Sequence, residues 1–233
     1  MKTRLDKILS ESNILTRSES KAAAKHGRLA VNGVTVKTSD VKVDDGDAIT
    51  LDGNEIKRRR FFYIMMNKPA GYVCSTDEPG SKTVLDLLRP EDKARNMFPA
   101  GRLDKDTVGL LLITNDGALA HDLLSPKKHV TKKYAFRCAH PLSARDIERL
   151  EHGVEIDGEM TKEAKVESCG VEGTITITEG KFHQIKRMFI SVGNSIEYLK
   201  RLEFGPLLLD TSLAEGEYRF LTDKETDSLL NRE

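Results

Sequence analysis

One stretch, residues 101–117, limits what this chain can fold into more than any other. It reads GRLDKDTVGLLLITNDG, and its second half is an unbroken apolar run, residues 108–113, that ends at a turn-forming Asn-Asp-Gly. Such a run predicts a strand buried on both faces. The four charges that directly precede it, on Arg102, Asp104, Lys105 and Asp106, belong either to a solvated loop or to a chemical site. The charges alone do not decide between the two.

The composition narrows the class of protein. With 233 residues, the chain can hold one large domain, or a large and a small one. No apolar run approaches the roughly 20 residues of a membrane-spanning helix, and the first residues lack the apolar region of a signal peptide. The three widely spaced cysteines, Cys74, Cys138 and Cys169, form neither a disulfide framework nor a CxxC motif. We therefore expect a protein of the reducing cytoplasm, without a membrane partner.

The first sixty residues are predicted to form a small module of two helices and a hairpin. An apolar spacing typical of a helix comes first, followed by a capping box, Thr16 to Glu19, that begins a second helix. The dipeptide Asn32-Gly33 between two alternating segments predicts a tight hairpin. The expected elements are helices over 5–9 and 16–27, and strands over 28–31, 34–37 and 48–51.

This module resembles the S4 RNA-binding domain in its R-L-D-K start, its V-N-G turn and its G-D-x-I-x-L ending. Lysine plus arginine and aspartate plus glutamate both number 37, so an RNA partner has to be argued from where the charges lie. Residues Arg17, Lys21, Lys25 and Arg28 have the spacing of one helix face. The resemblance implies that they contact RNA phosphates, which provide affinity rather than base identity.

A polar, basic stretch over residues 53–60 is predicted to be a linker. It divides the chain into an S4-like domain, 1–58, and a second domain, 59–233. The second domain is expected to be α+β, with a mixed, mostly antiparallel sheet. Its predicted strands lie over 61–66, 108–113, 132–136, 154–156, 165–167, 174–178, 196–202, 207–209 and 218–221, and its helices over 118–124, 143–150 and 184–193.

Three segments of the second domain resemble pseudouridine synthases of the RsuA type, which modify small-subunit ribosomal RNA. They are GRLDKDTVGLLLITNDG, NKPAGYVCSTDEP and GKFHQIKRM. The resemblance implies that Asp104 is the single catalytic carboxylate and that Lys186 is its basic partner. It further implies that Arg102 helps to evert the target nucleotide, that Tyr134 packs on the everted uracil, and that Ile185 contacts the substrate.

Other residues of these motifs receive bland interpretations. Asp106 is expected to be a turn or hydrogen-bonding residue, and Lys68, in the NKPAG turn, is assigned no chemistry. His183 could suggest a general base, but it has no cysteine, serine or metal-ligand partner in the sequence, so a structural role is expected. An ion pair between Lys186 and Asp104 would keep the carboxylate charged and oriented.

The implied reaction breaks the N-glycosidic bond of a uridine, turns the base and rejoins it through carbon, so it requires no cofactor or metal. The sequence contains no Walker motif, no glycine-rich dinucleotide loop and no Cys/His cluster. Asp104 could attack the nucleotide covalently or remove a ribose proton. We expect a monomer that acts on small-subunit ribosomal RNA.

Three alternatives stay open. A sister activity on large-subunit ribosomal RNA shares most of these motifs. The chain could also be a non-catalytic RNA-binding or ribosome-assembly factor, in which the S4-like domain carries the function. A hydrolase that uses Asp104 and Asp106 as paired carboxylates is the third, because residues two apart on an extended segment share a face.

Overall fold

The computed structural model describes residues 2–58, 60–94 and 96–231. The chain forms two compact units. Unit 1 contains Met1–Phe62 and Arg89–Met97, and unit 2 contains Tyr63–Leu88 and Phe98–Glu233. Arg59, in the predicted linker, lies outside the described residues. The domain boundary at residue 58 stays a prediction.

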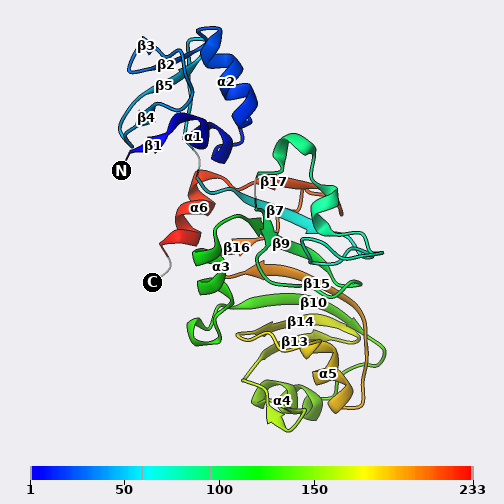
Figure 1. Ribbon diagram of the computed structural model, residues 1–233. Coiled ribbons are helices and arrows are strands. Elements are labelled where there is room, and N and C mark those ends of the chain that lie inside the picture. The colour runs from blue at the N-terminus through cyan, green and yellow to red at the C-terminus, as the bar shows by residue number, and fades with distance from the viewer. Residues whose placement is uncertain (1, 59, 95, 232–233) are drawn as a thin grey trace. The chain divides into compact units, whose positions relative to one another are not determined.

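Unit 1 has the predicted helices and hairpin (Figure 1). The Thr16 side chain and the Glu19 carboxylate form the predicted capping box at the beginning of the second helix. Asn32 and Gly33 both have positive φ, 50° and 78°, as a tight hairpin turn requires. Its elements are β1 (Thr3–Arg4), α1 (Leu5–Glu11), α2 (Arg17–Lys25), β2 (Leu29–Val31), β3 (Val34–Thr35), β4 (Lys42–Val43), β5 (Ile49–Leu51), β6 (Asn54–Glu55) and the 3-10 turn η2 (Pro90–Asp92).

The prediction of a linker over 53–60 is wrong at its beginning. Asp52 and Gly53 adopt positive φ and form a second tight turn, so the chain reverses and β6 pairs with β5. The resulting four-stranded sheet has the order β3-β2-β5-β6. Its buried core consists of Leu5, Ile8, Leu9, Ala23, Ala24, Leu29, Val43 and Ile49.

Unit 2 is built on a mixed sheet in which β13-β14-β10-β15-β9-β7-β17 are neighbours in that order (Figure 1). Among the described residues, β15 and β9 pair in parallel and the other neighbours pair antiparallel. The α+β prediction is confirmed. The strands are β7 (Tyr63–Lys68), β8 (Phe98–Pro99), β9 (Val108–Thr114), β10 (Lys132–Cys138), β11 (Glu155–Ile156), β12 (Glu159–Met160), β13 (Lys165–Cys169), β14 (Glu172–Ile177), β15 (Ile196–Phe204), β16 (Leu207–Leu208) and β17 (Tyr218–Phe220).

The helices of unit 2 begin where the sequence provides caps. The predicted cap at Ser143 is part of a capping box, and Asp116 caps the helix after β9. A C-terminal helix with its own capping box at Thr222 was not predicted. The helices are α3 (Gly117–Leu124), α4 (Ala144–His152), α5 (Gln184–Ser191) and α6 (Asp223–Leu230), with short 3-10 turns η1 (Val84–Leu87) and η3 (Pro126–Lys128).

Strand β9 lies in the middle of the unit 2 core, and all seven of its residues are buried, as predicted. Leu110 and Leu112 pack in one cluster with side chains of α3 and with Leu229 of α6. The neighbouring strand ends two residues later than predicted, because Asn67 and Lys68 continue β7 and pair with Leu110 and Gly109 of β9. These two strands bring the loop before β9 next to the end of β7.

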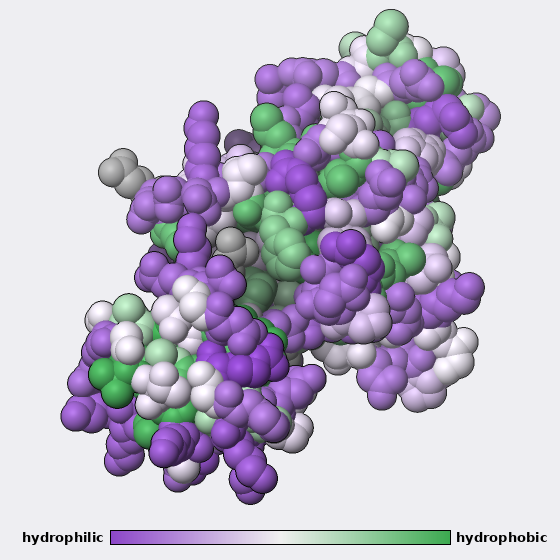
Figure 2. All heavy atoms as spheres, turned by 90° about the horizontal axis from the view of Figure 1, so that it is seen from above, coloured by the Kyte–Doolittle hydropathy of each residue, from purple (hydrophilic) through white to green (hydrophobic). Residues whose placement is uncertain are grey.

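Hydrophilic side chains are spread over the face seen in Figure 2, and hydrophobic ones are scattered among them. None of the helices in the described part of the chain is both long and apolar enough to cross a membrane.

Candidate active site

The loop of residues 101–107 places Asp104 directly before the buried strand β9. The backbone turns tightly here, with Thr107 N donating to Asp104 O at 3.1 Å. Gly101 begins the loop at φ 87°, and a Cβ at this position would come within 2.8 Å of the Leu124 side chain. Gly71 N donates to Lys105 O at 2.7 Å, which ties the loop to the turn after β7. The position of the Asp104 backbone is therefore fixed from both sides.

Lys68 supports this loop from below. Its side chain is fully buried, and its Nζ donates to Pro69 O at 3.0 Å, Lys105 O at 3.2 Å and Thr107 O at 2.9 Å. Burial lowers the pKa of Lys68, and nearby groups that include the carboxylates of Asp104 and Asp106 oppose that shift. The expectation that Lys68 is only part of a loop is therefore corrected. It connects two chain segments beneath Asp104.

Lys186, near the beginning of α5, contacts both carboxylates of the loop. Its Nζ lies 3.3 Å from Asp104 Oδ2 and 2.6 Å from Asp106 Oδ1. The hydrogen bond from Lys186 lowers the pKa of Asp106. Burial lowers the pKa of Lys186, but the hydrogen bond to Asp106 and the charges of both carboxylates outweigh it, and the net shift is upward. The lysine is therefore charged at neutral pH and shared by two anions.

His183 also reaches Asp104, which the sequence did not predict. Its Nε2 lies 3.5 Å from Asp104 Oδ1, and its side chain is 41% exposed. The residue adopts the left-handed conformation, φ 49° and ψ 34°, at the N-cap of α5. No sequence signal indicates a left-handed histidine, because this conformation is usually taken by glycine or asparagine. The expected structural role is thus incomplete, since the ring faces the carboxylate.

The remaining predicted site residues of unit 2 lie on several elements. Tyr134 is buried in β10, where its register partners are Ile175 of β14 and Arg201 of β15. Ile185 is buried in the first turn of α5, next to Lys186. Arg102 is exposed on the Asp104 loop. Direct contacts thus join Asp104, Asp106, His183 and Lys186, while the roles of Tyr134, Ile185 and Arg102 stay predictions.

Comparison with known proteins identifies the family of this arrangement. A family model described as RNA pseudouridylate synthase matches residues 62–191, and an S4 domain model matches residues 3–49. The chain belongs to the RNA pseudouridylate synthase family. The predicted family is thereby confirmed, and the chain is an RNA-modifying isomerase with an N-terminal S4 domain.

Relatives of this RNA pseudouridylate synthase match it over nearly their full length. An uncharacterized RNA pseudouridine synthase of Bacillus subtilis is 48% identical and covers 98% of both chains. Ribosomal small subunit pseudouridine synthase A of Vibrio parahaemolyticus is 39% identical, over 98% of this chain and 100% of that protein. A crystal structure of a pseudouridylate synthase is 38% identical, with a TM-score of 0.69 over 97% of this chain and 99% of that chain.

The S4 domain of this synthase carries the predicted basic face. Arg17, Lys21 and Lys25 are exposed on α2, whose buried side consists of Ser20, Ala23 and Ala24. Arg28 follows the helix, and its Nε donates to Asp52 Oδ1 at 2.8 Å within a two-point contact to that carboxylate. Since this charge already has a partner, Arg28 is less available to RNA than the three cations of α2.

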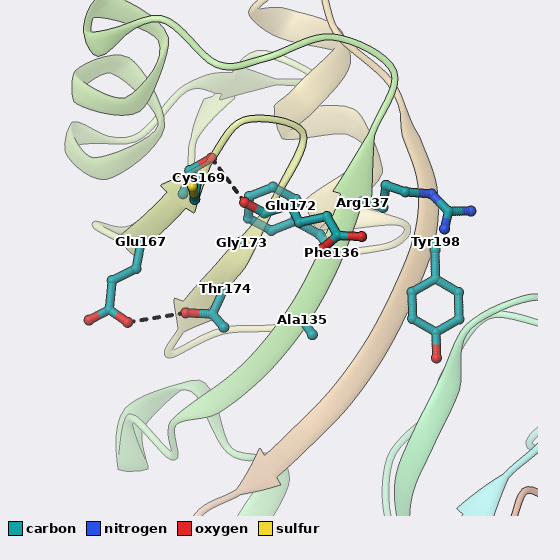
Figure 3. Close-up of a pocket in the computed structure, with 10 residues that line it drawn as sticks. Ala135, Phe136, Arg137, Glu167, Cys169, Glu172, Gly173, Thr174 and Tyr198 are labelled. Atoms are coloured by element: carbon teal, nitrogen blue, oxygen red, sulfur yellow. Dashed lines mark hydrogen bonds between the residues drawn. The ribbon is translucent and has the colours of Figure 1, made fainter.

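A separate shallow hollow lies on the sheet of unit 2, with walls from β10, β13, β14 and β15 (Figure 3). Its polar groups largely partner one another. Thr174 Oγ1 donates to Glu167 Oε2 at 3.3 Å, and Arg137 pairs with Glu197 at 3.4 Å. None of the predicted site residues lines this hollow. Within residues 2–58, 60–94 and 96–231, no three histidine, cysteine, aspartate or glutamate residues are grouped as a metal site needs.

Proposed function

We propose that this synthase converts a specific uridine of small-subunit ribosomal RNA to pseudouridine, with Asp104 as its catalytic carboxylate. The observation that carries the proposal is the contact of Asp104 with both Lys186 and His183 on a loop that the buried Lys68 supports. Relatives that are 39% and 40% identical are named ribosomal small subunit pseudouridine synthase A, which supports the choice of substrate.

The reaction is an isomerisation whose atoms balance without a co-reactant. The bond between N1 of uracil and C1′ of ribose breaks, the base turns, and a bond forms between C5 and C1′. C5 loses its proton and N1 gains one. An ionised Asp104 starts this sequence either by attacking the nucleotide or by removing a ribose proton. No cofactor is part of the proposal.

Lys186 keeps Asp104 ionised and oriented, because an adjacent cation favours the charged form of a carboxylate. It does so as a shared partner, since Asp106 holds the same ammonium at the shorter distance of 2.6 Å. Asp106 is therefore proposed to position Lys186 rather than to react. This arrangement also argues against paired hydrolytic carboxylates, because one cation neutralises both anions.

The target base has to leave its stack before Asp104 can reach the ribose, at a cost of a few kcal/mol. Exposed Arg102 is proposed to assist eversion from the same loop. Tyr134 and Ile185 are proposed to contact the everted uracil, since an aromatic face is suited to hold an unstacked base. The S4 domain is proposed to bind phosphates through Arg17, Lys21 and Lys25, with a smaller part for Arg28. We propose that the enzyme acts as a cytoplasmic monomer.

Mapping of pseudouridines tests this function. Ribosomal RNA from cells with and without the protein is treated to form chemical adducts on pseudouridine, and primer extension locates the stops in both subunits. The proposal expects one stop in small-subunit RNA that depends on the protein and is not restored by Asp104→Asn. A dependent stop in large-subunit RNA would move the assignment to that substrate, and the absence of any dependent stop would favour a non-catalytic factor.

A further inference from the structure

An aromatic stack lies at the edge of the Asp104 site. The rings of Phe182 and His183 are 3.8 Å apart between centroids, with planes inclined by 21°. His183 Nε2 is the atom that lies 3.5 Å from Asp104 Oδ1. Phe182, in contrast, is 69% exposed. The stack therefore begins at the carboxylate and ends in an apolar ring that is open to solvent.

The turn that carries these rings is held in place by its neighbours. Gln184 accepts from Lys181 N at 2.8 Å and donates to Glu179 Oε1 at 2.7 Å. Arg187 Nη1 donates to Phe182 O at 3.3 Å, and Arg187 is itself paired with Asp157. An exposed apolar side chain is common on protein surfaces. This one is distinguished by a fixed backbone and by a ring-to-ring contact that leads to the active site.

The charges near the stack favour a base rather than a phosphate as its ligand. Lys181 pairs with Glu159 at 2.9 Å, Arg187 pairs with Asp157, and Lys186 pairs with the two carboxylates of the Asp104 loop. These cations are largely neutralised, so they attract a phosphate only weakly. A single open ring is also far smaller than a stable protein interface, which buries about 1,200 Å² or more. What the ring offers is an apolar face.

Eversion of a uridine creates a ligand for such a face. When the target base leaves the stack, the nucleotide beside it loses a stacking partner and exposes its own π-face. Aromatic side chains bind bases of this kind with little regard to sequence. We infer that Phe182 stacks on the nucleobase adjacent to the target uridine in the RNA. This inference rests on the proposed role of Asp104 as the reacting carboxylate.

A matched set of variants tests it. Phe182→Ala removes the ring, Phe182→Tyr keeps it, and Ile190→Ala removes a comparably exposed apolar side chain, 64% exposed, from the helix that follows. The substrate is the ribosomal RNA segment, of either subunit, in which the wild-type enzyme forms pseudouridine. This choice separates the inference from the small-subunit assignment. We expect Phe182→Ala to raise KM about tenfold with a smaller change in kcat. Phe182→Tyr and Ile190→Ala should stay within about twofold of wild type.

An RNA change identifies the base. Two further substrates carry an abasic nucleotide on the 5′ or on the 3′ side of the target. For one of them, wild type and Phe182→Ala should have the same KM, because the base on which the ring stacks is absent. For the other, the tenfold difference should persist. The inference is overturned if Phe182→Ala leaves KM unchanged on the intact RNA, or if the difference persists with both abasic substrates. Loss of product with Asp104→Asn is measured in parallel, so failure of the stack and failure of the catalytic assignment give different results.

Discussion

Replacing Lys68 by Met should loosen the loop that carries Asp104. Methionine has a similar length and is tolerated in cores, so the substitution removes the ammonium with little change in packing. Three carbonyl oxygens, those of Pro69, Lys105 and Thr107, lose their donor. The hydrogen bond to Thr107 is buried and the other two are partly buried, so Thr107 O has the poorest access to water after the change.

The size of the effect follows from this burial. A buried acceptor left without a donor costs about 1–3 kcal/mol, and a partly buried one costs less because water can replace the donor. Removing an ammonium whose pKa is lowered by burial relieves part of the loss. We expect a net loss of about 2–4 kcal/mol in the unfolding free energy of unit 2. Because a small displacement of a reacting group costs about 100-fold in rate, the single-turnover rate should fall on that order.

Two measurements on the same variant check this reasoning. Hydrogen exchange at the amides of β9 reports unfolding of unit 2 separately from unit 1, and single-turnover pseudouridine formation reports the rate. Lys105→Met is the matched control, since Lys105 is exposed in the same loop and only its backbone oxygen takes part in the contact to Lys68. It should change both quantities little. If Lys68→Met lowers stability but leaves the rate within about threefold, the contact to the loop carbonyls has no part in placing Asp104.

Three further predictions address the site, the core and the S4 domain. Asp104→Asn should abolish product with RNA affinity retained, while Asp106→Asn should reduce the rate much less; single-turnover assays with both variants would expose a reversed assignment. Burial, together with the charge of Arg201, lowers the pKa of Lys132 from 10.5 to about 8. The unfolded chain then binds more protons than the folded one between these pH values, so stability should rise with pH there. The rise should exceed that of Lys132→Met on the order of 3 kcal/mol, measured by denaturant titration across the window. Deleting residues 1–54 should flatten the dependence of log affinity on log salt by about 0.7–0.9 for each of the three phosphate-binding cations of α2 that the deletion removes; an unchanged slope would mean that unit 2 alone holds the RNA.

Local signals in the sequence predict most elements of the fold. The apolar run before Asn115 predicts β9, and the capping boxes at Thr16 and Ser143 predict the beginnings of α2 and α4, because these signals act within a few residues. The errors have tertiary causes. Helix α6 is missed because it has only one buried residue, Leu229, and therefore little apolar periodicity. The end of β7 is misplaced because Lys68 has the chemistry of a surface residue, and only its buried carbonyl partners, which belong to another segment, explain why it lies inside.

The candidate site depends on contacts that no local pattern contains. Only a family resemblance connects Asp104 with Lys186 in the sequence, since the two lie far apart along the chain and meet because α5 packs beside β15, the parallel neighbour of β9. The sequence favours a structural role for His183 because its partner, Asp104, is equally distant. A search for partners near in sequence finds hydrogen bonds within turns and misses those between elements.

The two lysines of the site act on different parts of the same loop, and this difference explains why both are needed. Lys68 binds backbone oxygens, so it fixes where the loop lies but does not select the charge state of Asp104. Lys186 binds carboxylate oxygens, so it favours the ionised form but approaches from a helix that could shift if the loop moved. A carboxylate that has to be both charged and placed to within a fraction of an ångström requires the two kinds of contact together. Loss of either lysine should therefore slow the reaction, but only loss of Lys68 should also destabilise unit 2 strongly.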